Sequence, residues 1–375
     1  MSSLYLHIPF CRRRCIYCDF YSSVRTGWRE RYVSALCLEL ECRRGYLVDP
    51  VRTVYFGGGT PSLLSIEQLG RIFGVIDRVW GMGSVEEVTL EANPDDLSCE
   101  YVEALRRDLP INRLSIGIQT FDDVRLRRLG RRHSAEQAVR AVERSRQAGF
   151  GNVSIDLIYG LPGETLEDWR RDLDVAVGLG VEHISAYHLT FEEGTVLYGL
   201  LRRGRVREPE EELSVAMSEL LEDCLAAAGY VHYEVSNFCL PGCHSRHNWS
   251  YWDGSSYAGV GASAHSYDGR SREWNVASLS GYVEGMERGC RCMEREVLTV
   301  DMRYNERVLT ALRTCVGLDL GGVRRDFGRE RAEYCLRMAE RYLRGGELVL
   351  EGDCLRLSRR GLLVADGVIA ELMAV

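Results

Sequence analysis

The sequence contains no lysine, and all 47 of its basic residues are arginine. This absence excludes a P-loop, in which a lysine contacts the nucleotide phosphates, and any mechanism that passes through a lysine Schiff base. Arginine is clustered in two short runs, at residues 12–14 and 202–207. Such runs are more often solvated faces of a protein than binding sites, and we expect solvated surface in both.

Long apolar runs and an excess of positive charge are also missing. No run approaches the roughly 18 apolar residues of a membrane span, and the N-terminus enters a predicted strand without the apolar region of a signal peptide. The net charge of −8 argues against a general nucleic-acid binder, which would show a basic face. We expect a cytoplasmic monomer or homodimer with no nucleic-acid partner and at most transient membrane contact.

Cysteine is abundant, with 14 residues, and without an export signal we expect reduced thiols, some of them on metal. Cys11, Cys15 and Cys18 stand at C-x3-C-x2-C spacing in the run HIPFCRRRCIYCDF. Three thiolates can hold three irons of a [4Fe-4S] cluster and leave the fourth iron open. An open iron can chelate the amino and carboxylate groups of S-adenosylmethionine and pass it an electron, which makes a carbon radical. A zinc loop or incidental buried thiols are the alternatives.

The first half of the chain alternates short β-rich runs with amphipathic stretches, the pattern of repeated βα units around a parallel sheet. Six strands are predicted, at residues 4–8, 53–56, 87–92, 113–118, 152–159 and 183–189. The helices predicted between them are at residues 28–44, 65–80, 98–108, 134–148 and 164–179. Six units make an incomplete barrel, so we expect an α/β fold built on a partial (β/α)6 barrel, with its chemistry at the C-terminal ends of the strands.

The rest of the chain has a different pattern. An acidic helix at about 208–228 and a strand at 230–235 precede a segment rich in glycine, serine and aromatic residues. Residues 298–375 predict helices and a hairpin that turns at Gly352 and Asp353, which is the order of a small winged-helix-like α+β domain. We therefore expect three parts: a core at 1–235, a connecting segment at 236–297 and a C-terminal domain at 298–375.

A glycine-rich turn follows the second predicted strand, where Gly57, Gly58 and Gly59 precede Thr60. Without a Cβ, such residues let backbone groups approach a ligand closely, here the methionine amino group of the cofactor. Aromatic side chains surround the cysteines, and rings near a cluster exclude water and tune its potential. These rings, for which ordinary packing is the alternative explanation, belong to Tyr5, His7, Tyr17 and Phe20.

Polar side chains mark the ends of the next predicted strands. Glu91 ends the third strand, Gln119 follows the fourth, and Asp156 lies within the fifth. Their oxygens can accept hydrogen bonds from ribose hydroxyls or an ammonium group. Arg131, in the run LGRRH, could pair bidentately with a carboxylate. Each residue alone fits a structural salt bridge, but their joint placement favours a shared pocket.

Together these motifs resemble the HemN-like branch of the radical S-adenosylmethionine (SAM) superfamily, which includes oxygen-independent coproporphyrinogen III dehydrogenases and HemW-type heme chaperones. The motifs that carry the resemblance are Y-x-H-x-PFC-x3-C-x-YC, GGGTP, E-A-NP, GIQTFD, LGRRH and IDLIYGLPGET. The resemblance implies a radical SAM partial barrel with a HemN-like C-terminal domain, and a [4Fe-4S] cluster held by Cys11, Cys15 and Cys18. The residues that it implies for SAM are Tyr5, Tyr17, Gly58, Gly59, Thr60, Glu91, Gln119, Arg131 and Asp156.

Two departures separate the subfamilies. The dehydrogenases carry a fourth cysteine in C-x3-C-x2-C-x-C, but that position here is Phe20, and the resulting CDF ending resembles the HemW type. The run HNWSYW at residues 247–252 resembles the H-N-x-x-Y-W motif of the same type. Imidazole can ligate heme iron, and the flat rings of Tyr and Trp can face a porphyrin. The heme residues implied in this way are His247, Asn248, Tyr251 and Trp252; the alternative is a buried loop whose histidine caps backbone carbonyls.

Three further groups of side chains are outside this scheme. The first is a C-x3-C-H-x2-H segment that superficially resembles a zinc site. It consists of Cys239, Cys243, His244 and His247. The second is the pair Cys290 and Cys292, which could be redox active or have no role. The third is His265, on another glycine-rich loop that could face the same pocket.

The resemblance implies a heme chaperone that binds heme together with a SAM-ligated cluster and hands heme to acceptor proteins such as respiratory enzymes. A flavodoxin or ferredoxin would serve as reductant. Two enzymes are the alternatives. One is an oxygen-independent coproporphyrinogen III dehydrogenase, which forms protoporphyrinogen IX by radical decarboxylation, and Phe20 and HNWSYW weigh against it. The other is a radical methylase that opens heme and releases its iron.

Overall fold

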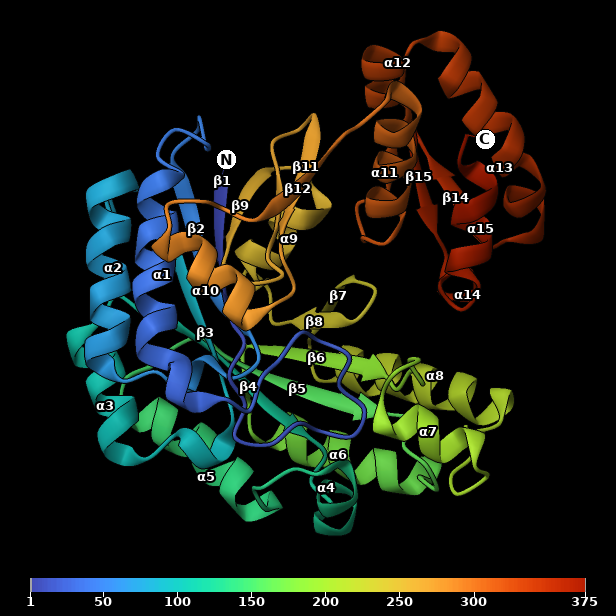
Figure 1. Ribbon diagram of the computed structural model, residues 1–375. Helices are drawn as coiled ribbons and strands as arrows, with labels where there is room; N and C mark the ends of the chain where they lie inside the picture. Colours follow the sequence, from blue (N-terminus) through green and yellow to red (C-terminus); the bar gives the residue numbers. More distant parts are fainter. Residues whose placement is uncertain (1, 375) are drawn as a thin grey trace.

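Six parallel strands in chain order form the centre of the molecule, which a computed structural model describes over residues 2–374 (Figure 1). Each of the six overlaps one of the predicted strands, so the alternation of strands and helices read from the sequence is confirmed. The strands are β1 (Ser2–Ile8), β2 (Val51–Gly58), β3 (Glu87–Ala92), β4 (Arg113–Gln119), β5 (Val153–Tyr159) and β6 (His183–His188).

Amphipathic helices cover the outer face of these strands. In α2 (Ile66–Trp80) the buried Leu69, Ile72, Phe73 and Ile76 recur at helical spacing, and Ser65 and Gln68 form a capping box at its start. The other predicted helices are α1 (Arg29–Cys42), α3 (Cys99–Asp108), α5 (Ala135–Gln147) and α6 (Leu166–Gly178). The sequence also predicted α8 (Glu211–Ala227) but missed α4 (Asp123–Leu129) and α7 (Val196–Arg202), which are too short for a clear apolar period.

The sheet extends beyond the six central strands at both edges. Beside β1 it continues with β9 (Ser256–Val260), which is parallel to β1, and then with three antiparallel strands: β10 (His265–Tyr267), β11 (Ser271–Asn275) and β12 (Met293–Val297). Beside β6 it continues with β8 (Asn237–Cys239) and β7 (Val231–Glu234). The order is β12-β11-β10-β9-β1-β2-β3-β4-β5-β6-β8-β7, and within residues 2–374 the two ends do not join. The incomplete barrel is therefore confirmed.

The segment expected to connect two domains supplies β8 to β12 of this same sheet, together with α9 (Arg246–Trp252) and α10 (Leu279–Glu287). Its strands were not predicted, because runs such as SYAGV lack an apolar alternation of their own. The inner half of β9 becomes buried because this strand pairs with β1 and packs against α1. The division of the chain at residues 235 and 297 stays a prediction.

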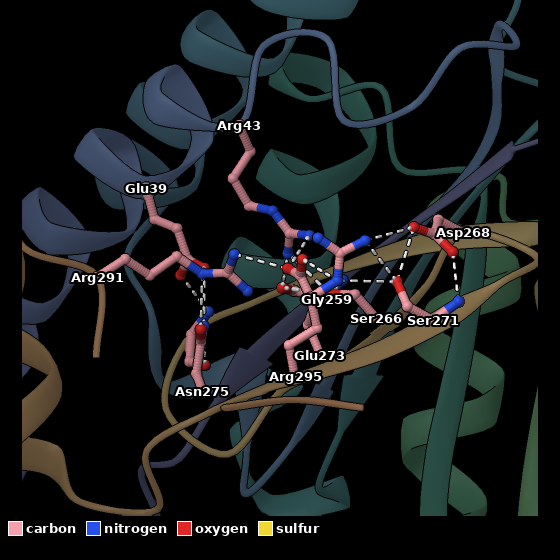
Figure 2. Close-up of polar contacts among 11 residues, drawn as sticks. Glu39, Arg43, Gly259, Ser266, Asp268, Ser271, Glu273, Asn275, Arg291 and Arg295 are labelled. Carbon is pink, nitrogen blue, oxygen red and sulfur yellow. Dashed lines mark hydrogen bonds and ion pairs between the residues drawn. The ribbon is translucent and has the colours of Figure 1, made fainter. Parts of the chain in front are cut away.

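A buried polar network ties α1 to these added strands (Figure 2). Glu39, which is 0% exposed, accepts hydrogen bonds from Asn275 Nδ2 at 2.7 Å and from the Tyr282 hydroxyl at 2.7 Å. One turn later, Arg43 donates to the carbonyl oxygen of Gly259 at 2.6 Å. Because a buried charge needs several partners to be tolerated, these contacts fix β9 and β11 against α1.

The C-terminal part has its own apolar core, which includes Tyr304, Leu318 and Leu355. Its three-stranded sheet has the order β13-β15-β14, and the predicted hairpin turn at Gly352 and Asp353 joins β14 to β15. Its elements are α11 (Val300–Leu312), β13 (Leu318–Asp319), α12 (Leu320–Phe327), α13 (Arg329–Gly345), β14 (Leu348–Glu351), β15 (Cys354–Leu357), α14 (Arg359–Leu362) and α15 (Ala365–Leu372). The predicted α+β arrangement is thus confirmed. None of the helices in residues 2–374 is both long enough and apolar enough to cross a bilayer.

Candidate cofactor site

The three cysteines of the N-terminal motif lie in one loop, residues 9–23, which follows β1 and is called the cysteine loop below (dark blue in Figure 1). Cys11, Cys15 and Cys18 all line a cavity of about 570 Å³ at the C-terminal ends of the central strands. Backbone hydrogen bonds anchor the loop: the Ile16 N–H donates to Leu129 O at 3.1 Å and the Cys11 N–H donates to Ser23 O at 3.0 Å. The structure therefore brings the three thiols together at the end of the barrel where chemistry was expected.

The surroundings of these thiols suit a cluster. Thr60 Oγ1 donates to Cys11 Sγ at 3.5 Å, and Arg131 Nη1 donates to Cys15 Sγ at 3.6 Å. Such donors stabilise thiolates, but burial, with a smaller contribution from the two neighbouring cysteines, raises the pKa of Cys18 to about 11, so bound iron would be needed to hold this group as a thiolate. Within residues 2–374, no three His, Cys, Asp or Glu side chains converge closely enough to hold a single metal ion. In a [4Fe-4S] cluster each thiolate binds its own iron, so the residues fit a cluster and give no support to a zinc loop.

The glycine turn lies directly beside the cysteine loop. Gly58 has a φ of +109°, and a Cβ there would lie 2.5 Å from the His7 ring. A Cβ on Gly59 would lie 2.7 Å from the backbone carbon of Pro9, and the Gly59 N–H donates to Ile8 O at 2.8 Å. The missing side chains thus let the loop after β1 pack onto the end of β2, and they also leave Gly58 and Gly59 in the cavity wall.

Two partly buried carboxylates lie deeper in the same cavity. Glu91 accepts a hydrogen bond from the Tyr55 hydroxyl at 2.8 Å and another from the Gly58 N–H at 3.1 Å, so it joins β2 to β3. Burial raises the pKa of Glu91 to about 7 and also raises the pKa of Asp156. Ser115 Oγ donates to Asp156 Oδ1 at 3.3 Å. Both carboxylates can therefore accept from a ligand that brings its own positive charge or hydroxyl groups.

Gln119 and Arg131 form the wall across β4. Gln119 adopts a φ of +76°, a conformation that costs free energy for a residue with a side chain and is typical of functional sites. Arg131 follows Gly130, the left-handed C-cap of α4, and its guanidinium contacts Asn93 Oδ1 at 2.7 Å and the Gly117 carbonyl oxygen. The guanidinium is thereby fixed between the cysteine loop and the ends of β3 and β4.

Aromatic side chains occupy the mouth of the cavity. Tyr17 lines it between two cysteines, and burial raises the pKa of its hydroxyl, which stays protonated. Phe20, at the position of the dehydrogenases' fourth cysteine, also lines the cavity and is 65% exposed. Tyr187 and His188, at the end of β6, complete this rim. The rim places apolar surface in solvent at the entrance, where a large apolar molecule could rest.

A second, inner cavity of about 210 Å³ lies within the barrel and shares Glu91, Ser115, Asp156 and Tyr187 with the first. Tyr5 lines this inner cavity and not the outer one, because it lies one pleat earlier on β1 than His7, next to Tyr55. The family resemblance placed Tyr5 among the SAM residues, and that assignment stays a prediction. Most of the residues predicted for heme are here too: His247, Asn248 and Tyr251.

His247 is 1% exposed, and both of its ring nitrogens have partners. Nδ1 lies 2.8 Å from Thr53 Oγ1, and Nε2 lies 3.0 Å from the Tyr251 hydroxyl. Burial lowers the pKa of His247 to about 3, so the ring is neutral. The alternative interpretation was a buried loop whose histidine caps backbone carbonyls. The motif instead forms a helix, α9, and the His247 ring contacts side-chain hydroxyl groups. In this structure His247 is part of the packed barrel interior.

Apart from His247, the side chains of the remaining candidate groups line neither cavity. His265 is exposed on β10 and stacks on Trp274, with ring centroids 5.9 Å apart. All 14 cysteines are free of disulfide bonds, and Cys290 lies exposed in the loop before β12. The side chains of the C-x3-C-H-x2-H segment do not converge on a metal ion, because Cys239 is in β8 and His247 points into the barrel.

Sequence reasoning missed several residues of the site. Asn93 connects two predicted residues, since it accepts from Arg131 and donates to Thr60 Oγ1 at 3.2 Å. Its position directly after a strand, in the quoted run E-A-NP, was the available signal. Ser115 and Tyr187 line both cavities, but nothing in their local sequence marks them.

Comparison with known proteins agrees with this geometry. Residues 5–176 match the Radical SAM superfamily model, and residues 298–364 match the HemN C-terminal domain model. The solved structure of coproporphyrinogen III oxidase (HemN) from Escherichia coli superposes with a TM-score of 0.86, covering 100% of this chain and 90% of that one, at 22% identity. At that identity the likeness establishes the fold alone.

Sequence relatives are more similar. A protein of Lactococcus lactis named heme chaperone HemW is 41% identical over 84% of this chain and 83% of its own length. A protein of the same name from Mycobacterium tuberculosis is 39% identical over 99% of this chain and 94% of its own length. Identity at this level over nearly the full length of both proteins shows common family membership. The chain belongs to the HemW family of radical SAM proteins.

Proposed function

We propose that this protein is a heme chaperone, which binds heme and passes it to acceptor proteins without altering the porphyrin. The observation that carries the proposal is the 39% identity, over 99% of the chain, to a relative named heme chaperone HemW. Phe20 at the position of a fourth cysteine supports the same choice over a coproporphyrinogen dehydrogenase. Respiratory enzymes that contain heme are candidate acceptors.

The family to which the chain belongs uses SAM and a [4Fe-4S] cluster, and we propose that Cys11, Cys15 and Cys18 hold the cluster here. When bound, the cluster would supply the electron that SAM accepts. The cavity of about 570 Å³ is within the range of small-molecule sites, so SAM can lie against the glycine turn. The residues proposed to contact it in this cavity are Tyr17, Gly58, Gly59, Thr60, Glu91, Gln119, Arg131 and Asp156. Tyr5 belongs to the same proposal and lines the inner cavity, which shares Glu91 and Asp156 with this one.

The protein's own groups have distinct tasks in this proposal. Glu91 offers a carboxylate to the ammonium group of the ligand, because its pKa of about 7 leaves a large fraction ionised near neutral pH. Arg131 keeps the cysteine loop in place through Cys15 while its other nitrogen is held by Asn93. Tyr17 and the aliphatic walls exclude water, which strengthens each of these electrostatic contacts.

Heme ligation by His247 is a further part of the prediction, and the structure defines what it requires. The inner cavity of about 210 Å³ is smaller than typical small-molecule sites, so a whole heme does not fit beside this ring. Ligation would require helix α9 to move and the bonds to Thr53 and Tyr251 to break. A test of His247 therefore has to separate heme binding from folding.

The experiment is anaerobic reconstitution of the cluster, followed by heme titration, porphyrin analysis and transfer to a heme-free acceptor such as apomyoglobin. We expect stoichiometric heme uptake, an unchanged porphyrin and transfer to the acceptor. Under the ligation hypothesis, His247→Ala weakens heme uptake, and His265→Ala, which removes an exposed histidine, does not. Rapid consumption of coproporphyrinogen, with 5′-deoxyadenosine as a product, would overturn the chaperone assignment.

A further inference from the structure

A further concave surface is a groove that the sequence did not indicate. It has a volume of about 740 Å³, against about 570 Å³ for the cofactor cavity. It lies between the loop that joins β5 to α6, helix α7 and the start of α8, and one residue of the cysteine loop, Ile16, forms part of its wall. We call it the α7–α8 groove. Its volume is within the range of small-molecule sites, unlike that of the inner cavity.

The walls of the α7–α8 groove are mainly apolar. Leu161 and Leu197 are buried beneath it, while Ile16, Leu200 and Val206 are partly exposed along it. Apolar side chains that gather in one hollow, and are not scattered over a surface, are typical of ligand and partner sites. The groove can therefore accept a sizeable apolar body.

Arginines stand at the edge of these apolar walls. Arg128, Arg205 and Arg207 line the groove, are exposed, and form no ion pair with any residue in the described chain, 2–374. Two of them belong to the run at 202–207 that was expected to be ordinary solvated surface. Arg125 also lines the groove, but it is already bound to Asp122 and Asp168.

Carboxylates at the same edge only partly offset these cations. Glu208 and Glu210 line the groove as well, as does the buried Glu164, so three unpaired arginines face two exposed carboxylates and one buried carboxyl group. Free guanidinium groups bind carboxylates in bidentate geometry, and more readily beside an apolar surface than in open water. The edge therefore favours a ligand that carries carboxylates of its own.

We propose that the α7–α8 groove is the docking site for heme, with the porphyrin faces against the apolar walls and the propionates on Arg128, Arg205 and Arg207. This inference rests on the proposed chaperone function and adds the location and mode of recognition. None of the described residues that line the groove is His, Cys, Met or Tyr, the side chains that usually ligate heme iron. Recognition is therefore through the ring and the propionates, and it does not require the metal.

The position of Ile16 connects this groove to the cofactor site. Its neighbours Cys15 and Tyr17 line the cofactor cavity, while Ile16 itself lines the groove. Its backbone is bonded to both groove walls, through Leu129 O at 3.1 Å and the Leu197 N–H at 2.9 Å. A porphyrin in the groove would therefore contact the cysteine loop, which is proposed to hold the cluster.

The test is a binding titration of the full chain with heme and with metal-free protoporphyrin IX, read by absorbance and fluorescence. Both should bind with similar affinity, and the dimethyl ester of protoporphyrin, which lacks carboxylates, should bind about tenfold more weakly, as expected when charge-assisted contacts are lost. The variant Arg205→Gln with Arg207→Gln should show the same loss of about tenfold for the free acid. Its matched control, Arg202→Gln with Arg203→Gln, removes two charges outside the groove and should bind normally.

Each outcome decides one point. If the wild-type chain binds neither heme nor protoporphyrin, the proposed chaperone function fails. If it binds both, and the groove double variant and its control bind equally, the chaperone function stands and the α7–α8 groove is wrong as its site. Val206→Glu places a carboxylate on the apolar wall and gives an independent check should the arginine variant not fold. If heme binds while metal-free protoporphyrin does not, recognition passes through the iron, and the inference is overturned.

Discussion

Glu91→Gln removes a negative charge from the candidate cofactor site while keeping the shape of the side chain. The carboxylate accepts one hydrogen bond from the Tyr55 hydroxyl and one from the Gly58 N–H. Glutamine can keep both contacts, because its carbonyl oxygen can accept from Gly58 while its amide donates to the Tyr55 oxygen. The substitution thus removes a buried negative charge without leaving a buried group unpaired.

The effect on stability should depend on pH in a defined direction. Burial raises the pKa of Glu91 from 4.5 to about 7. Below pH 4.5 the group is protonated in both the folded and the unfolded chain, so its contribution to stability is complete there. As the pH rises through 7, ionisation favours the unfolded chain by up to about 3 kcal/mol, at about 1.4 kcal/mol per pKa unit. Glu91→Gln should therefore match the wild type at about pH 4.5 and exceed its stability by up to about 3 kcal/mol at pH 8.

Urea unfolding of the cluster-free protein, at several values between pH 4.5 and 8, measures this difference. Glu86→Gln is the control, since Glu86 lies at the surface in ion pairs with Arg52 and Arg246 and its loss should change stability by about 1 kcal/mol or less. SAM affinity of the reconstituted variant should fall about tenfold, because a charge-assisted hydrogen bond is lost. A Gln variant that is less stable than the wild type at pH 8, or a difference that does not change with pH, would refute the reasoning.

Three further predictions concern the cysteine loop, the buried network and the barrel interior. Gly59→Ala should lower iron uptake on reconstitution several-fold, because its Cβ would lie 2.7 Å from backbone, whereas Gly83→Ala meets nothing within 4 Å and should not. Glu39→Ala should lower the free energy of unfolding in urea by about 3–5 kcal/mol, because it leaves buried hydrogen-bond donors without an acceptor. Glu41→Ala, at the surface of the same helix, should lower it by about 1 kcal/mol or less. Similar losses in the two variants would contradict the role of the network. Because burial lowers the pKa of His247 to about 3, its contribution to stability is complete above pH 6.5 and is lost as the pH falls. The wild type should therefore lose up to about 3 kcal/mol relative to His247→Gln between pH 7 and 4, and parallel pH curves would contradict this.

The parts of the fold that could be predicted are those whose signal is local. The central strands are runs such as LYLHI and SIDLIY, buried on both faces, and each is followed by a helix with its own apolar stripe. The strands of 256–297 could not be predicted in this way. The run SYAGV becomes a strand because Arg43 of α1 binds the Gly259 carbonyl and because β1 offers a free edge, both about 200 residues or more away in sequence.

In the candidate site, too, the features with a local sequence signal could be predicted and the others could not. The spacing of the cysteines and the glycine turn could be read directly, and the structure places both in one cavity. Depth within the barrel could not be read: Tyr5 and His247, which the family resemblance assigns to SAM and to heme, line the inner cavity, and both assignments stay predictions. The α7–α8 groove could not be predicted because its walls come from separate elements of the chain. In the sequence Arg205 and Arg207 resemble ordinary surface residues, and only the structure shows that they line the same groove as Ile16 and Leu200.

The strand that leads into the cysteine loop is enclosed only late in synthesis. β1 pairs on one side with β2, but its other neighbour is β9, where Leu4 lies opposite Ala258. When the six central βα units have been synthesised, one edge of β1 therefore has no paired strand. A nascent polypeptide shorter than about 260 residues lacks the strand that covers this edge of β1.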